Sequence, residues 1–331
     1  MYTLDVTSKE IYELITYRQK NFEVSLSTLG AGIEEIYTLS NKGKLENIVL
    51  SPSYFPTKEN EHSFLGKAIG PLAGRVPNSF INCQNNLFYL DKNEGSTSLH
   101  GGFHGFNTIF WSYQIVESAS KCSIIFTHTF PDGLGGYPGN RDVSIHYDIY
   151  PNQTISIEYI ATSDRFSLMN PTNHTYFNLS GNLVEGIDSH QLKLPSSLVS
   201  FLESDQTIKI SPTPIENTDF DFRKAKSLAT VLHSKHPQIK QEAGLNHPFL
   251  LANPDKQVIL IHPKSGRKLK VTTTNKAVVI YTGNHFYEKQ LFPFYPGIAL
   301  ETQHVLTEFD YFSCIVEPDK PFYSKTVWEF S

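Results

Sequence analysis

Three alternating segments in the middle of the chain constrain its fold more than any other feature of its 331 residues. They span residues 122–130, 143–150 and 154–161. In the second segment, every other position is apolar: Val143, Ile145, Tyr147 and Ile149. This period of two is typical of a strand with one buried face. Pro151 and Asn152 separate the last two segments as a hairpin turn does. The sequence therefore predicts neighbouring antiparallel strands here.

The same alternation recurs along the rest of the chain. Further strands are predicted at residues 22–29, 33–39, 87–90, 257–262, 268–274, 277–282, 297–302 and 325–330. Residues 46–66 are predicted to form a loop and residues 192–222 an extended segment, since both are rich in proline. One short helix is predicted around Leu228, Val231 and Leu232. Because no repeat or linker interrupts the pattern, we predict an all-β chain with a single domain, a large antiparallel β-sandwich over residues 1–331.

The composition excludes several classes of function. The formal net charge is −5 and the basic residues form no stripe, which argues against a nucleic-acid groove. Three widely spaced cysteines, Cys83, Cys122 and Cys314, predict neither a disulfide framework nor a zinc site. The sequence contains no run of about 18 apolar residues, so no membrane span is predicted. Residues 1–20 lack the apolar core of a signal peptide. We therefore expect a cytoplasmic protein without nucleic-acid or membrane partners.

Residues 170–181 gather polar and aromatic side chains around one imidazole, His174. Pro171 favours extended backbone before it, and the β-branched and aromatic residues after it favour a strand. In such a strand, His174 shares a face with Thr172 and Tyr176. From this segment alone, a core histidine bound to a neighbouring backbone group is as well supported as a functional one.

Four other residues are candidates for chemistry. Glu301 ends an apolar run, so it is either a salt-bridged residue or a general base at the floor of a pocket. His100 and His104 have the i, i+4 spacing of helical zinc ligands, but the glycines around them argue against a helix and thus against a metal site. Arg75 follows a glycine-rich segment and is either a surface ion-pair partner or a donor in a cleft.

Five short motifs follow one another in a fixed order. They are Leu-His-Gly-Gly-x-x-Gly-Phe (99–106), Gly-Tyr-Pro-Gly (136–139), Thr-Asn-His-x-Tyr-Phe-Asn-Leu-x-Gly (172–181), Tyr-Thr-Gly-Asn (281–284) and Leu-Glu-Thr-Gln (300–303). In these motifs and their order the chain resembles the aldose 1-epimerases, the galactose mutarotases. The resemblance implies a large antiparallel β-sandwich and a reaction without metal or cofactor. It also implies that Glu301 is the catalytic base and His174 the catalytic acid, while His100 and Arg75 line the sugar site.

The implied reaction opens and closes a sugar ring by acid–base catalysis. A carboxylate takes the proton of the C1 hydroxyl while an imidazolium gives one to the ring oxygen, which requires pKa values near the working pH. We expect burial to raise the pKa of Glu301, and a nearby carboxylate to raise that of His174. Phe103 and Tyr176 are expected to pack on the sugar face.

Three positions depart from the family pattern. Asn246 stands where the family usually has aspartate, Val279 where relatives often have glutamine, and Gly74 where an asparagine often precedes the arginine. These positions read sugar hydroxyls, so we expect weaker monosaccharide binding with the acid–base chemistry intact. On this view, Asn246→Asp lowers KM. Alternatively, Asn246 only caps a turn beside Pro248.

The sequence thus predicts an aldose 1-epimerase that interconverts the α and β anomers of galactose or glucose, as a monomer or homodimer. One alternative is a hexose-6-phosphate 1-epimerase, which would need basic residues over its pocket. The motifs supply only Arg75. The other is a non-catalytic sugar-binding or sensing protein on the same fold. Glu301 and His174 argue against it, because a binder needs no matched acid and base.

Overall fold

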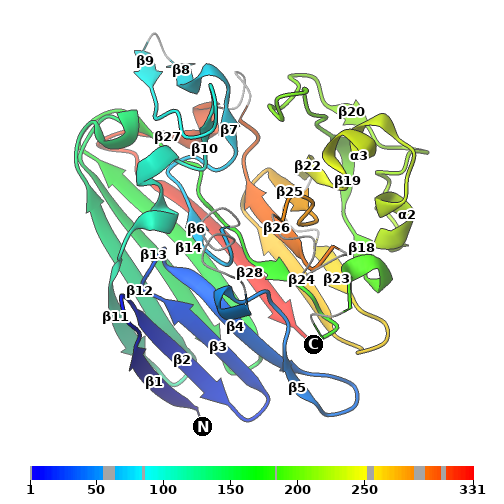
Figure 1. Cartoon of the computed structure of the whole chain (residues 1–331). Coiled ribbons are helices and arrows are strands. Elements are labelled where there is room, and N and C mark those ends of the chain that lie inside the picture. The colour runs from blue at the N-terminus through cyan, green and yellow to red at the C-terminus, as the bar shows by residue number, and fades with distance from the viewer. Residues whose placement is uncertain are drawn as a thin grey trace.

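Two layers of antiparallel strands face each other across one large core (Figure 1). The computed structural model describes residues 2–54, 64–83, 86–182, 185–251, 257–286, 295–306 and 311–331. Among these residues, no helix reaches the length and apolar character that a membrane crossing requires.

The first layer is a nine-stranded sheet. Its order is β11 (Ser112–Glu117), β12 (Cys122–Phe130), β13 (Arg141–Tyr150), β14 (Thr154–Ser163), β28 (Phe322–Phe330), β24 (Lys268–Thr273), β23 (Val258–Ile261), β18 (Gln191–Lys193) and β21 (Lys226–Ser227). The three alternating segments are β12, β13 and β14, paired as predicted. The apolar residues of β13 enter the core.

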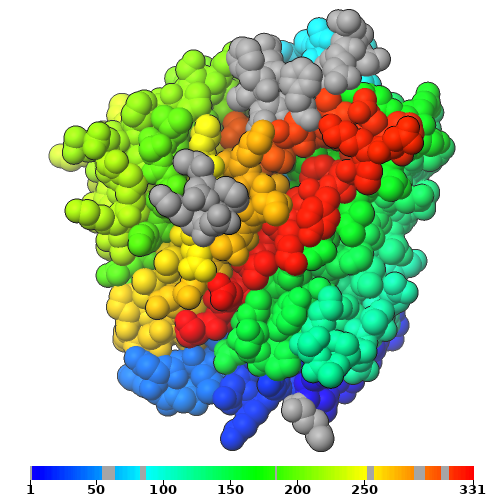
Figure 2. All heavy atoms as spheres, turned by 180° about the vertical axis from the view of Figure 1, so that it is seen from behind, coloured from blue at the N-terminus to red at the C-terminus, as the bar shows by residue number. Residues whose placement is uncertain are grey.

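Figure 2 shows the outer face of this sheet, with β28 running diagonally across it. Along β28, buried and less buried residues alternate.

The facing layer consists of two sheets. One contains β1 (Thr3–Ser8), β2 (Glu13–Gln19), β3 (Phe22–Ser27), β4 (Gly32–Leu39) and β5 (Leu45–Asn47). The other contains β17 (Tyr176–Phe177), β26 (Ile298–Gln303), β25 (Ala277–Tyr281), β22 (Asn246–Leu251), β19 (Ser196–Val199) and β20 (Thr213–Pro214). A bridge between Val49 and Phe177 connects the two.

Aromatic contacts between the layers define the core. Phe22 of β3 packs on Phe330 of β28 with ring centroids 5.7 Å apart. Phe177 of β17 meets Trp328 of β28 edge-on at 5.0 Å. Because buried aromatic side chains contribute most per residue to such a core, these contacts hold the sheets face to face. The predicted β-sandwich is confirmed.

Short elements at one end of the sandwich carry the remaining motifs. Four strand pairs lie there or nearby: β6 (Ala68–Ile69) with β16 (Thr172–Asn173), β7 (Arg75–Val76) with β10 (Ser98–Leu99), β8 (Phe80–Cys83) with β9 (Asn86–Tyr89), and β15 (Ser167–Leu168) with β27 (Ile315–Val316). The 3-10 turns are η1 (Pro52–Tyr54), η2 (Pro77–Ser79), η3 (Gly102–His104), η4 (Phe106–Thr108), η5 (Leu134–Gly136), η6 (Ile187–Ser189) and η7 (Tyr311–Cys314).

The structure departs from the prediction in several places, among them the unpredicted strand β11. β1 and β2 were not predicted; β1 is mostly exposed and so shows no apolar period. The segment before β22 holds two helices instead of one, α2 (Leu228–Leu232) and α3 (Pro237–Glu242). Of the predicted loop 46–66, residues 55–63 lie outside the described residues, and the backbone of 48–50 pairs beside β17.

Candidate active site

A pocket of about 270 Å³ brings together all five site residues that the sequence predicts. Arg75 lies on β7, His100 directly follows β10, and His174 lies between β16 and β17. Asn246 begins β22, and Glu301 lies on β26. Five separate elements thus converge on one cavity.

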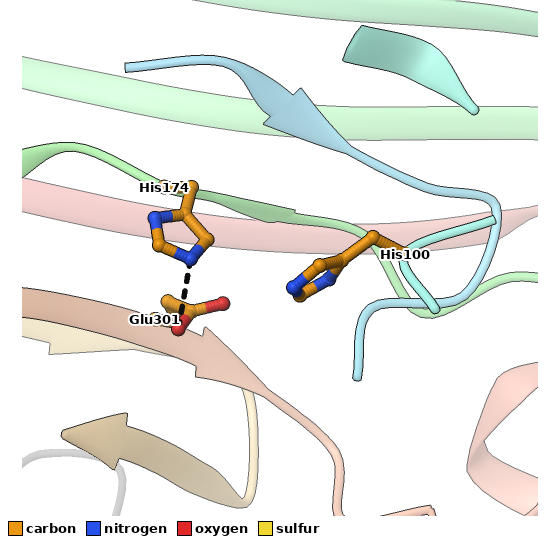
Figure 3. A group of neighbouring side chains, drawn as sticks. All are labelled: His100, His174 and Glu301. Carbon is orange, nitrogen blue, oxygen red and sulfur yellow. Dashed lines mark ion pairs between the residues drawn. The ribbon is translucent and has the colours of Figure 1, made fainter. Parts of the chain in front are cut away.

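His174 and Glu301 form the buried floor of this pocket. Their side chains point toward each other, with His174 Nε2 and Glu301 Oε1 3.6 Å apart (Figure 3). Only 3% of His174 and 4% of Glu301 is exposed. His174 is not in a continuous strand as predicted, because β16 ends at Asn173 and β17 begins at Tyr176. Backbone hydrogen bonds to Gly66 and Lys67 hold it instead, and its ring lies 4.8 Å from that of Tyr176.

Burial shifts the pKa of each member of this pair. It raises the pKa of Glu301 to about 8, in the predicted direction. It lowers the pKa of His174 to about 4, which is opposite to the prediction. The physical reason is that an uncharged Glu301 provides no negative charge to stabilise an imidazolium, so desolvation dominates. At a pH between these two pKa values, Glu301 is protonated and His174 is neutral, so the pair holds one proton in total.

His100 presents a hydrogen-bond donor to the same space. Its Nδ1 accepts from the backbone N–H of Gly74 at 3.2 Å, which places the ring hydrogen of the neutral imidazole on Nε2. Burial, with smaller effects from His174 and Arg75, keeps the pKa of His100 well below its usual range. The following Gly101 has φ +90°, and a Cβ there would lie 2.0 Å from the carbonyl oxygen of Gly70. Glycine is therefore required for His100 to stand where it does.

Arg75 is a donor in the cleft and an ion-pair partner at once. Its Nε and Nη2 donate to the two carboxylate oxygens of Glu94, at 2.6 and 2.8 Å. Thr97 Oγ1 donates to the same carboxylate at 3.1 Å. This bidentate contact holds the guanidinium in place and leaves the Nη1 donors for a ligand. Glu94 also lines the pocket, and sequence reasoning missed it because it lies in a turn without a motif.

The Tyr-Thr-Gly-Asn motif positions Asn246. Thr282 Oγ1 accepts from the backbone N–H of Leu245 at 2.9 Å, and Asn284 Nδ2 donates to the carbonyl of Leu245 at 2.7 Å. Tyr281 pairs with Asn246 across β25 and β22. Asn246 is thus held at the pocket wall, and its side-chain amide donates to Glu242.

Val279, the second departure from the family pattern, stands directly opposite Glu301. The two residues are paired across β25 and β26, and both line the pocket. Val279 places an apolar side chain beside the Glu301 carboxylate. This environment agrees with the raised pKa of Glu301.

Other pocket residues were not predicted as part of the site. Gln206 and His285 line the wall near Asn246, and sequence reasoning had no motif to find Gln206. Gln303, from the Leu-Glu-Thr-Gln motif, lines the pocket with a buried Oε1 that has no hydrogen-bond partner among the described residues. Tyr176 lines the pocket as expected, whereas Phe103 is 62% exposed and lies outside the lining.

In the part of the chain that the structure describes, one group of side chains could hold a metal ion. Ligand atoms of His100, His174 and Glu301 lie within 4.8 Å of one another. A carboxylate and two imidazoles at this spacing can also move protons to and from a bound molecule without a metal ion. His104 is exposed and outside the pocket lining, so the i, i+4 histidine pair does not form a site.

Comparisons with known proteins agree on one family. The family model described as aldose 1-epimerase matches residues 13–328. The aldose 1-epimerase of Haemophilus influenzae is 31% identical over 258 residues, covering 75% of this chain and 73% of its own. The galactose mutarotase of Rattus norvegicus is 28% identical over 305 residues, covering 88% and 85%. The crystal structure of galactose 1-epimerase from Lactobacillus acidophilus covers 100% of this chain and 98% of its own, with a TM-score of 0.88 and 27% identity. The chain therefore belongs to the aldose 1-epimerase family.

Proposed function

We propose that this chain interconverts the α and β anomers of galactose or glucose, with Glu301 and His174 moving the protons. The observation that carries the proposal is the buried pair of these two side chains, 3.6 Å apart at the floor of the pocket. Arg75 and His100 supply donors beside it. The names of the relatives support galactose as the first substrate to test.

The proton held by the pair makes the reaction possible. Its movement from Glu301 to His174 produces a carboxylate and an imidazolium. The carboxylate then takes the proton of the C1 hydroxyl, the imidazolium protonates the ring oxygen, and the C1–O5 bond breaks to give the open-chain aldehyde. C1 turns about its bond to C2, and the reverse transfers close the ring on the other face. Catalysis of this kind typically contributes roughly 10²–10⁴-fold.

The other site residues hold the sugar. The Nη1 donors of Arg75 and the Nε2–H of His100 are suited to the ring oxygen and hydroxyls, because fixed donors stabilise charge that develops on oxygen. Asn246 is proposed to contact a further hydroxyl. We also propose that the enzyme works without metal or cofactor, as one domain over residues 1–331, in the cytoplasm and as a monomer or homodimer.

A hexose-6-phosphate is a poorer substrate for this pocket. Among the described lining residues, Arg75 is the one lysine or arginine, and Glu94 already neutralises it. A phosphate group would meet the Glu94 carboxylate without a free cation to offset it. The pocket therefore favours an uncharged sugar.

Polarimetry of freshly dissolved sugars tests the proposal. The purified chain should accelerate the change in optical rotation of α-galactose or α-glucose far above the spontaneous rate. α-Maltose tests whether a disaccharide is accepted, and glucose 6-phosphate should be turned over poorly. Binding of galactose without acceleration would favour the non-catalytic alternative and refute the proposal.

A further inference from the structure

Glu242 is a buried carboxylate directly behind the pocket wall. It is the last residue of α3, only 1% of it is exposed, and its Oε2 accepts a hydrogen bond of 3.1 Å from Asn246 Nδ2. Burying a carboxylate is costly unless it is compensated, and the C-terminal end of a helix disfavours negative charge. Neither the sandwich core nor the acid–base chemistry explains why this position carries a carboxylate.

Glu242 connects several side chains of the pocket wall. Gln206 Nε2 donates to its Oε2 at 3.3 Å, Gln241 Nε2 donates to its Oε1 at 3.1 Å, and His285 Nε2 lies 3.9 Å from Oε2. Burial alone would raise the pKa of Glu242, but the nearby His285 and the hydrogen bonds from Asn246 and Gln241 outweigh it and keep the pKa below its usual value. Glu242 is therefore an anion held by three residues that line the pocket and by Gln241.

The contact with Glu242 decides which way the amide of Asn246 faces. An ionised carboxylate only accepts hydrogen bonds, so the NH₂ group of Asn246 must point toward it. The carbonyl oxygen, on the other side of the planar amide, is left for the pocket that Asn246 lines. Asn246 then offers a sugar hydroxyl an acceptor, as an aspartate would.

We propose that Glu242 is a positioning residue for sugar recognition, which holds the Asn246 amide so that its oxygen accepts a hydrogen bond from a sugar hydroxyl. The proposal rests on the proposed function and deepens it. This role of Glu242 reverses the effect expected of Asn246→Asp, because a second carboxylate beside Glu242 would be repelled and KM at neutral pH should rise instead of fall.

A set of four variants of the full chain tests the proposal with α-galactose. In Glu242→Gln the Asn246 amide can face either way, so KM should rise about tenfold while kcat stays within about twofold. Asn246→Asp should also raise KM, and less so at lower pH, where one of the two carboxyl groups takes up a proton. The double variant again has one carboxylate and one amide, and KM should return to within about threefold of wild type.

Gln241→Met is the matched control. Gln241 also donates to Glu242, but it is exposed and does not line the pocket. Its loss removes one contact to Oε1 and keeps the bond between Asn246 Nδ2 and Oε2, so KM should stay within about twofold of wild type. Dissociation constants for galactose, measured by titration calorimetry on the same proteins, should follow the same order without depending on catalysis.

An unchanged KM and Kd in Glu242→Gln would overturn the proposal, as would a KM that falls in Asn246→Asp. If circular dichroism shows that Glu242→Gln does not fold, the proposal is tested by Asn246→Asp alone, from the direction in which its KM changes and from how that change depends on pH. A wild-type chain that binds galactose without turning it over refutes the proposed function instead, and the dissociation constants then still test the role of Glu242.

Discussion

Val279→Gln should move the alkaline limit of activity to lower pH. Val279 stands directly opposite Glu301 across β25 and β26, and both side chains line the pocket. Directly paired residues have Cβ atoms about 4.5–5.5 Å apart, so the amide of a glutamine can reach the carboxylate. A hydrogen bond to the charged form of Glu301 lowers its pKa, which is about 8 in the present pocket.

The size of the shift follows from the strength of that bond. Hydrogen bonds to charged groups contribute about 1.5–3 kcal/mol, and one pKa unit corresponds to about 1.4 kcal/mol. The pKa should therefore fall by about one to two units. In the proposed mechanism the pair of Glu301 and His174 is active only while it holds one proton, so the whole alkaline limb of kcat/KM should move with the pKa of Glu301.

The assay is polarimetry of α-galactose from pH 4 to 10, with the spontaneous rate subtracted at each pH. Val279→Met is the matched control, since it fills similar space without an amide donor. The reasoning is refuted if Val279→Gln leaves the alkaline limb in place while galactose still binds, or if Val279→Met shifts the limb equally.

Three further predictions concern the wild-type site and its scaffold. The profile of kcat/KM against pH should be bell-shaped, with a fall of about tenfold per pH unit on each side. The acid limb should begin below about pH 4, where His174 brings a second proton to the pair, and the alkaline limb above about pH 8, where Glu301 loses the last proton. A flat profile from pH 3 to 10 would contradict this prediction. Exhaustive chelation with EDTA should leave activity intact, and a loss that one specific ion restores would show a metal requirement. Gly101→Ala should destabilise the fold by at least about 2 kcal/mol in urea denaturation, because its Cβ would lie 2.0 Å from a carbonyl oxygen and φ is +90°; wild-type stability would show that the turn adapts.

The fold was predictable where strands have one buried and one solvated face. β12, β13 and β14 meet this condition, so their alternation is visible in the sequence. β1 is exposed along nearly its whole length and carries no such signal. Whether residues 1–331 form a single domain stays a prediction.

The candidate site was predictable only where residues belong to motifs. His100, His174 and Glu301 were found together because each motif resembles the same family. Glu94 and Glu242 were missed because they come from a turn and a helix end whose contacts are set by packing between distant segments. The pKa of His174 was predicted in the wrong direction, since the balance between burial and a nearby charge depends on whether Glu301 is ionised.

Glu301→Gln tests the central claim most directly, by comparison of kcat for α-galactose with that of the wild type in the polarimeter. Glutamine keeps the shape of the side chain and removes the base, so kcat should fall by roughly 10²-fold or more. Calorimetry should show galactose binding within about threefold of wild type. Near wild-type turnover in this variant would remove Glu301 from the mechanism and contradict the acid–base account of the pocket.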